Sequence, residues 1–195
     1  MADALRHPQT YLLISILFLI VTGNQALIFF LPSITDNMKT MPIAIRTIAA
    51  GLPYACSAVG ILINGMWAHR TGALRWHTAI PVLATGVSLT LTVLAGDRAW
   101  LAMSLFCLAG FTSQAYLPVL WTVPTKVLGK SAAATAVGLV CLGNLGGVAG
   151  PWLFGYLRTV TGGYDAGLLV LAGCMLLAGT LATQIRLART ADSPK

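Results

Sequence analysis

The side chains of this sequence that could contact a solute are amides and one phenol, and each lies inside a long apolar stretch. They are Asn24, Gln25, Asn64, Gln114, Tyr116 and Asn144. An amide donates and accepts hydrogen bonds with a hydroxylated or carboxylated solute, but it cannot carry a proton or neutralise an anion. The alternative is that each amide only bonds to a neighbouring helix, which contributes about 0.6 to 2 kcal/mol in membranes.

Residues for covalent, acid–base or metal chemistry do not cluster in the sequence. The three histidines, His7, His69 and His77, lie at the ends of apolar stretches, and the four cysteines form no C-x-x-C pair. The stretch ending in Gly129, Lys130 and Ser131 resembles the tail of a phosphate-binding loop, but Pro124 stands where the first glycine is required. We therefore expect no enzyme activity, no cofactor and no metal.

The composition indicates which elements must position these side chains. The chain of 195 residues is 57% hydrophobic and 9% charged, with a mean hydropathy of +0.82, whereas soluble domains contain about 25% charged residues. Glutamate is absent, and the five aspartates lie at chain ends or in short polar breaks. The net charge of +7 is scattered in ones and twos, which argues against nucleic acid as a partner. The partner of most of the surface is expected to be a lipid bilayer.

A bilayer core about 30 Å thick requires roughly 20 apolar residues of helix. The sequence predicts an all-α membrane protein with a single bundle of six transmembrane helices near residues 11–31, 47–68, 77–95, 99–123, 132–157 and 166–185. Lysine and arginine outside these spans number eight on one side and four on the other. By the positive-inside rule, both termini are expected in the cytoplasm, with the protein in the inner (plasma) membrane.

Two glycine patterns predict how the helices pack. Gly143, Gly146, Gly147 and Gly150 form a stripe on the fifth span, and we expect Gly143, Gly147 and Gly150 to pack against another helix. Exposure of this backbone to substrate is the alternative. A second pattern appears at an offset of 90 residues, where Gly60, Gly65 and Gly72 lie over Gly150, Gly155 and Gly162. The two copies would cross the membrane in opposite directions, which predicts an inverted repeat of three plus three helices.

The segment Ile63 to His77, "INGMWAHRTGALRWH", resembles the short cytoplasmic loop of major facilitator permeases, usually G-x-x-x-D-R-x-G-x-x-R. Gly65, Arg70, Gly72 and Arg75 match, and His69 stands where the family normally has aspartate. The resemblance implies a gating loop made of these five residues. Because histidine is at most partly charged at cytoplasmic pH, and then positively, the usual attraction between aspartate and arginine is expected to be absent.

The segment Leu120 to Ala172 and the run "FFLPSI", Phe29 to Ile34, resemble more specifically the anion:cation symporter group, from its seventh helix to after its twelfth. This resemblance implies the C-terminal half of a permease that carries a small organic anion together with a proton or sodium by alternating access. Val140 stands where many relatives carry a second asparagine. The residues expected to face the substrate cavity are Asn24, Gln25, Gln114, Trp121 and Asn144.

The resemblance also leaves alternatives open. The missing partner is expected to be an N-terminal six-helix half, with this chain as a gene fragment, a split subunit or a truncated reading frame. Because the two halves of such transporters run in the same direction across the membrane, a second copy of this chain is a possible partner in a homodimeric half-transporter. A non-transporting membrane interaction protein or decayed remnant is the third interpretation.

Overall fold

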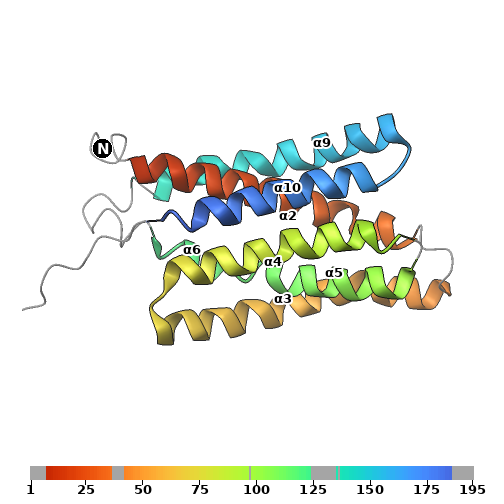
Figure 1. Cartoon of the computed structure of the whole chain (residues 1–195), viewed down its shortest axis with the longest axis horizontal. Helices are drawn as coiled ribbons and strands as arrows, with labels where there is room; N and C mark the ends of the chain where they lie inside the picture. The colour runs from red at the N-terminus through yellow and green to blue at the C-terminus, as the bar shows by residue number, and fades with distance from the viewer. Residues whose placement is uncertain (1–7, 37–41, 97, 124–134, 136, 186–195) are drawn as a thin grey trace, which may run out of the picture.

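The computed structural model describes residues 8–36, 42–96, 98–123, 135 and 137–185, which form an elongated bundle of helices (Figure 1). The described residues contain no strand, and the predicted all-α fold class is confirmed. The elements are α2 (Pro8–Asp36), α3 (Ile43–Thr71), α4 (Leu74–Leu94), α5 (Ala99–Ser113), α6 (Leu117–Leu120), the 3₁₀ helix η1 (Cys141–Leu145), α9 (Gly146–Thr161) and α10 (Asp165–Ala182).

Five helical stretches of the described chain are long and apolar enough to cross a membrane. They are Pro8–Asp36, Leu74–Leu94, Ala99–Leu120, Val137–Thr161 and Asp165–Ala182. Helix α3 has 29 residues, as many as α2, but it is not among these stretches. Helix α3 is long enough to span a bilayer and packs along α5. The predicted span at residues 47–68, which lies within α3, stays a prediction. Large apolar side chains such as Val148 and Trp152 are 75% and 69% exposed, as expected for a surface in contact with lipid.

The predicted fourth span, residues 99–123, is interrupted in the structure. Helix α5 ends at Ser113, residues Gln114 to Tyr116 form a turn, and α6 follows with Pro118 as its second residue. Proline has no N–H, and its ring would clash with the carbonyl of the residue four positions earlier, here Gln114. The chain avoids this clash by a tighter turn, in which Leu117 N donates to Gln114 O at 3.0 Å.

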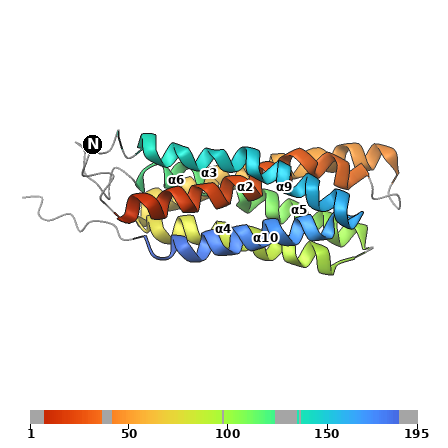
Figure 2. The same ribbon diagram turned by 90° about the horizontal axis from the view of Figure 1, so that it is seen from above.

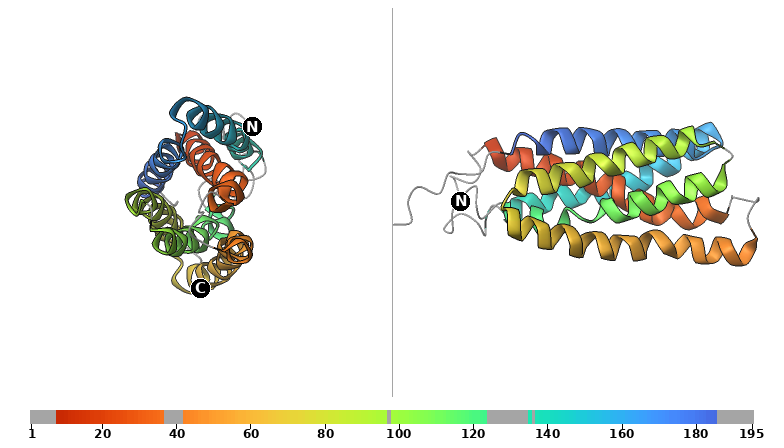
Figure 3. Two further views of the ribbon diagram at one scale, coloured as in Figure 1. Left: turned by 90° about the vertical axis from the view of Figure 1, so that its right-hand side faces the viewer. Right: turned by 60° about the horizontal axis from the view of Figure 1, so that its bottom comes forward.

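The predicted repeats are α2, α3 and α4, and α5, α9 and α10. The helices pack in two groups of three, and each group combines two helices of one repeat with one helix of the other. Seen end-on (Figure 3, left), α2 lies with α9 and α10, whereas α5 lies with α3 and α4. The two groups join along α4 and α10, which run side by side in Figures 1 and 2. Exchanging the first three helices for the last three maps the contact of α2 with α9 onto that of α5 with α3. The packing therefore has the symmetry that an inverted repeat requires.

The ends of α3 and α9 are built alike. Gly72 has φ 65° and its N–H bonds to Ala68 O, while Gly162 has φ 71° and its N–H bonds to Arg158 O. Both pairs are related by the offset of 90 residues. Glycine occupies a left-handed backbone at low cost and satisfies a helix carbonyl that would otherwise lack a donor. The glycines that suggested the repeat in the sequence thus end equivalent helices.

Gly60 and Gly150 show the same equivalence inside the bundle. A Cβ at Gly60 in α3 would clash with the backbone carbonyl of Phe111 in α5, and a Cβ at Gly150 in α9 would clash with that of Thr22 in α2. In both places, the absence of a side chain lets two backbones approach closely, which is how helices gain packing energy in lipid.

Two apolar cores lie toward the two ends of the bundle. One contains Leu13, Val82 and Ile185, and the other contains Leu31, Phe106 and Phe154. Along the helices that contribute to these cores, the residues between the two cores include buried polar side chains. These are Thr22, Asn24, Thr85, Thr112 and Ser113. Most of the hydroxyls bond to a carbonyl of their own helix, as Thr22 does to Phe18 O at 2.7 Å, so they need no partner outside it.

Candidate functional site

Two of the predicted cavity residues meet in the structure. Asn24 in α2 and Gln114, directly after α5, line one cavity of about 30 Å³. They are also related by the offset of 90 residues. Asn24 is only 4% exposed, and the side-chain oxygens Asn24 Oδ1 and Gln114 Oε1 have no hydrogen-bond partner among the described residues. A buried acceptor without a donor costs about 1–3 kcal/mol, so these oxygens are suited to a ligand that brings donors.

The rest of this cavity is mostly apolar, and it joins three helices. Its other lining residues are Leu27, Ile28, Leu31, Pro53, Tyr54, Ser57, Gly110 and Ser113. The Tyr54 hydroxyl donates to Ile28 O at 2.8 Å, which links α3 to α2 beside the cavity. A volume of about 30 Å³ is far below the roughly 300–1,000 Å³ of typical ligand pockets. The amide pair therefore offers two contacts to a solute and does not enclose one.

Gln25 and Asn144 lie on a different face. Both are exposed, and the Gln25 side chain passes beside Gly147 of α9, one turn after Asn144. The Asn144 amide donates to Cys141 O within η1 at 3.1 Å. Val140, where many relatives carry asparagine, is 1% exposed and belongs to an apolar core. Gln25 and Asn144 thus lie at the surface formed by α2 and α9, outside the Asn24 cavity.

Trp121, the fifth predicted cavity residue, follows α6. It is partly buried and packs against the apolar core that contains Leu13 and Val123. It does not line the cavity of Asn24 and Gln114. The five predicted residues are therefore spread over three places, and of these residues Asn24 and Gln114 alone line the cavity described above.

Asn64 was considered with the other amides, and its role in the structure is to bond helices together. Its Nδ2 donates to His77 O in α4 at 2.9 Å and to Ala115 O in the break after α5 at 2.7 Å. The first carbonyl lacks a helical donor because Pro81, four residues later, has no N–H. No sequence pattern predicts this pairing, because both acceptors are backbone atoms of other segments.

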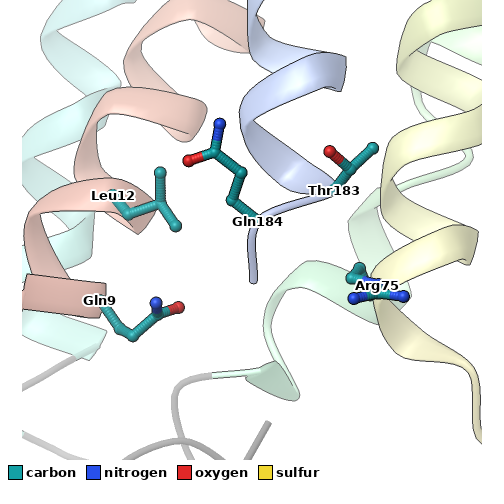
Figure 4. A pocket seen from close by; sticks show the side chains of 5 residues that line it. All are labelled: Gln9, Leu12, Arg75, Thr183 and Gln184. Atoms are coloured by element: carbon teal, nitrogen blue, oxygen red, sulfur yellow. The ribbon is translucent and has the colours of Figure 1, made fainter. Parts of the chain in front are cut away.

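Four of the five predicted gating residues line two pockets at the end of the bundle where α3 meets α4. Gly65, His69 and Gly72 line a pocket of about 380 Å³ with Pro118 and other residues of the α6 region. Arg75 lines a separate pocket of about 460 Å³ with Gln9, Leu12, Thr183 and Gln184 (Figure 4). The Arg75 guanidinium lies 4.9 Å from the centre of the Trp76 ring, a cation–π distance. Arg70 is exposed at the end of α3.

The glycine stripe of the fifth span lies against α2. A Cβ at Gly143 would lie 2.8 Å from Leu17 Cβ, and one at Gly146 would clash with the carbonyl of Phe18. Gly150 meets Thr22 in the same way, whereas Gly147 lies at an ordinary 3.6 Å from Gln25 and Val21. Of the three glycines expected to pack, Gly143 and Gly150 make the close approach, and Gly146 makes it in place of Gly147.

Comparison with known proteins identifies relatives of this chain. No family model matches the chain. The inner membrane transport protein RhmT of Escherichia coli (strain K12) is 29% identical over 192 residues, which are 97% of this chain and 44% of that protein. A putative tartrate transporter of Agrobacterium vitis is 28% identical over 160 residues, 82% of this chain and 35% of the relative. The chain spans less than half the length of these curated relatives.

Among solved structures, the Escherichia coli fucose:proton symporter FucP matches 96% of this chain with 45% of its own, at a TM-score of 0.83 and 15% identity. This chain resembles half of a major facilitator transporter. At 15% identity, the match to FucP shows the fold alone. The curated relatives of this chain are transporters rather than enzymes, in agreement with the sequence-based expectation. Together with its apolar helices, they support a multi-pass membrane protein.

Proposed function

We propose that this chain is the C-terminal six-helix half of a permease that carries a small organic anion with a proton or sodium by alternating access. Its likeness to transporters extends over 97% of the chain for RhmT. Its likeness to a putative tartrate transporter, over 82% of the chain, supports an organic acid as the substrate. In this proposal both termini are cytoplasmic and the membrane is the inner (plasma) membrane.

The observation that carries the proposal is the amide pair, Asn24 and Gln114. Each repeat brings one uncharged side-chain oxygen, unpartnered, to a shared cavity between helices. A solute that carries hydroxyl or carboxylic O–H groups would donate to these oxygens. The cavity is too small to hold such a solute alone, so the remaining contacts must come from another surface.

That other surface belongs, in this proposal, to a second six-helix unit. Described residues that line the amide cavity include no lysine or arginine, so the cation that neutralises a carboxylate is assigned to the partner. Gln25 and Asn144, exposed on α2 and η1, are positioned to complete the substrate cavity against it. The partner is either an N-terminal half or a second copy of this chain.

Uptake by proteoliposomes tests the proposal. The preparations are the chain alone, two copies joined in tandem, and the chain with the first six-helix half of RhmT, each checked for folding by circular dichroism. Labelled tartrate is offered with an imposed proton or sodium gradient, followed by a panel of other organic acids. Gradient-dependent flux only with the RhmT half assigns the partner, and flux from the tandem assigns a homodimer. No flux of any acid in all three folded preparations overturns the proposal and favours a non-transporting membrane protein.

A further inference from the structure

A polar network at the end of the bundle where α3 meets α4 has hydrogen-bond geometry that depends on the protonation of His77. His77 Nδ1 lies 2.8 Å from Asn64 Oδ1, and His77 Nε2 lies 2.7 Å from the Thr71 hydroxyl oxygen. The Thr71 hydroxyl also lies 2.9 Å from Trp67 O. The donors and acceptors in this network determine which protonation state of the His77 ring satisfies all of its hydrogen bonds.

The orientation of the Asn64 amide is fixed by its two carbonyl partners. His77 O and Ala115 O are both acceptors, so the amide nitrogen must face them and use both of its protons there. Asn64 Oδ1 then faces His77 Nδ1 and requires a donor. His77 Nδ1 therefore carries a proton.

The contacts of Thr71 determine whether the second ring nitrogen, Nε2, carries a proton. A hydroxyl has one proton, which it donates either to Trp67 O or to His77 Nε2. If Nε2 carried no proton, one of these two short contacts would join two acceptors. If Nε2 carries a proton, it donates to Thr71, and Thr71 donates to Trp67 O. All five hydrogen bonds are formed only when His77 is doubly protonated.

We propose that His77 is a proton-binding site whose imidazolium form closes a hydrogen-bond network joining α3, α4 and the break between α5 and α6. Histidine is the side chain that ordinarily titrates between about pH 5 and 8. The contact of His77 with Thr71 lies at the exposed surface, at the end of α3. Loss of the proton removes one bond of the network at the end of α3.

The charges around His77 do not supply a counter-ion. The charged or titratable side chains that the packed elements bring to this end are His69 and Arg70 from α3, Arg75 from α4 itself, and Tyr116 from the α5–α6 segment, while the described end of α10 brings none. Arg75 lines the separate pocket with Gln184 (Figure 4). None of these groups is acidic, so the partners of the imidazolium in the described structure are two hydrogen-bond acceptors, Asn64 Oδ1 and the Thr71 hydroxyl oxygen.

The fold itself does not demand this network. At the offset of 90 residues, the positions of Asn64 and His77 are occupied by Phe154 and Gly167. A Cβ at Gly167 would lie 2.6 Å from the Phe154 ring, so the second repeat makes an apolar contact at the equivalent place. Phe154 is fully buried. The proton site is therefore a feature of one end of the bundle only.

Nuclear magnetic resonance of the full chain in lipid nanodiscs tests the site. Labelled histidine is observed in a variant with His7→Gln and His69→Gln, so that His77 gives the only signal. The ¹⁵N shifts are expected to show two protonated ring nitrogens at low pH, both hydrogen-bonded, and to titrate to the form protonated at Nδ1. Titration to the form protonated at Nε2 would overturn the proposal.

The direction in which one substitution changes the proton affinity of His77 distinguishes the proposed imidazolium from a neutral histidine. Thr71→Val removes the acceptor of the Nε2 proton and is expected to lower the proton affinity of His77 about tenfold, since a hydrogen bond to a charged group contributes about 1.5 kcal/mol. If the neutral ring instead accepts from Thr71, the same change raises the affinity. A rise or no change therefore overturns the proposal.

Two control variants keep this result interpretable. Thr71→Ser retains the hydroxyl and is expected to restore the original affinity. Thr161 makes the same bond to its own helix, to Leu157 O at 2.8 Å, at the equivalent position of the second repeat. Thr161→Val should leave His77 unchanged, and an equal effect from it would overturn the proposal. The measurement requires no transport, so its outcome is independent of the proposed function.

Discussion

Asn24 and Gln114 line one cavity from repeat-related positions, and the side-chain oxygen of neither accepts a hydrogen bond within the described structure. Asn64, in contrast, donates to carbonyls of two other segments. The same residue type therefore has opposite energetic effects at the two sites. An orphaned acceptor lowers the stability of the folded chain, whereas a bonded amide raises it.

Replacing Asn24 by leucine is expected to stabilise the isolated chain. The substitution removes a buried acceptor that has no donor, and the adjacent cavity provides room for the larger side chain. We expect a gain of about 1 kcal/mol in the free energy of unfolding, measured by denaturant titration in detergent. Asn64→Leu is the matched comparison and should lose about 2 kcal/mol, because two carbonyls lose their donor. Equal shifts in one direction would contradict this account.

Alanine at Gly60 or Gly150 is expected to destabilise the bundle by about 1–3 kcal/mol, because each new Cβ would meet a backbone carbonyl that cannot move aside. Thermal unfolding monitored by circular dichroism measures the effect. Gly51→Ala in α3 and Gly173→Ala in α10 serve as controls, since a Cβ at either position has no neighbour within 4 Å. The repeat symmetry predicts similar losses for Gly60 and Gly150, and a loss at only one of them would argue against equivalent packing.

Cysteines at His69 and Thr159 are expected to react from opposite sides of the membrane. The two residues are exposed, lie at the offset of 90 residues, and stand near the ends of α3 and α9. The background carries serine at Cys56, Cys107, Cys141 and Cys174. A membrane-impermeant maleimide applied to intact cells should label only the Thr159→Cys variant if the termini are cytoplasmic. Labelling of both variants from the same side would refute the inverted arrangement.

Alanine at both Gln25 and Asn144 is expected to leave the stability of the single chain nearly unchanged, within about 0.5 kcal/mol, because both side chains are exposed. In the two-unit preparation that transports, the same double variant should reduce uptake at least tenfold if these amides contact substrate. Phe29→Ala, at an exposed residue of α2, is the control for general surface changes. Unchanged uptake by the double variant would remove both residues from the substrate cavity.

The helical architecture and the repeat could be predicted from the sequence because both follow from local rules. Apolar stretches of bilayer length must be helical, and glycine recurs wherever the backbone adopts a positive φ or approaches another helix. Gly72 and Gly162, for example, have the same backbone conformation in the structure. The interruption after Ser113 was not predicted, since a single proline such as Pro118 kinks some helices and ends others.

The candidate site was predicted only in part because its contacts are distant in sequence. The polarity of Asn24 and Gln114 indicated a role, but their meeting depends on how α2 crosses α5. The carbonyls that pair with Asn64 carry no side-chain signature, and the close approach of Gly146 rather than Gly147 depends on the rotation of α9 about its axis. These are tertiary facts, set by packing.

The exchange of helices between the two groups has a consequence for biosynthesis. Helix α5 emerges from the ribosome after α3 and α4, so its neighbours already exist when it enters the bilayer. Helix α2 emerges before α3, yet it packs mainly on η1, α9 and α10, which begin more than 100 residues later. Until then, the face of α2 that packs against Gly146 and Gly150 is uncovered, so the membrane insertion machinery must tolerate this face or another protein must shield it.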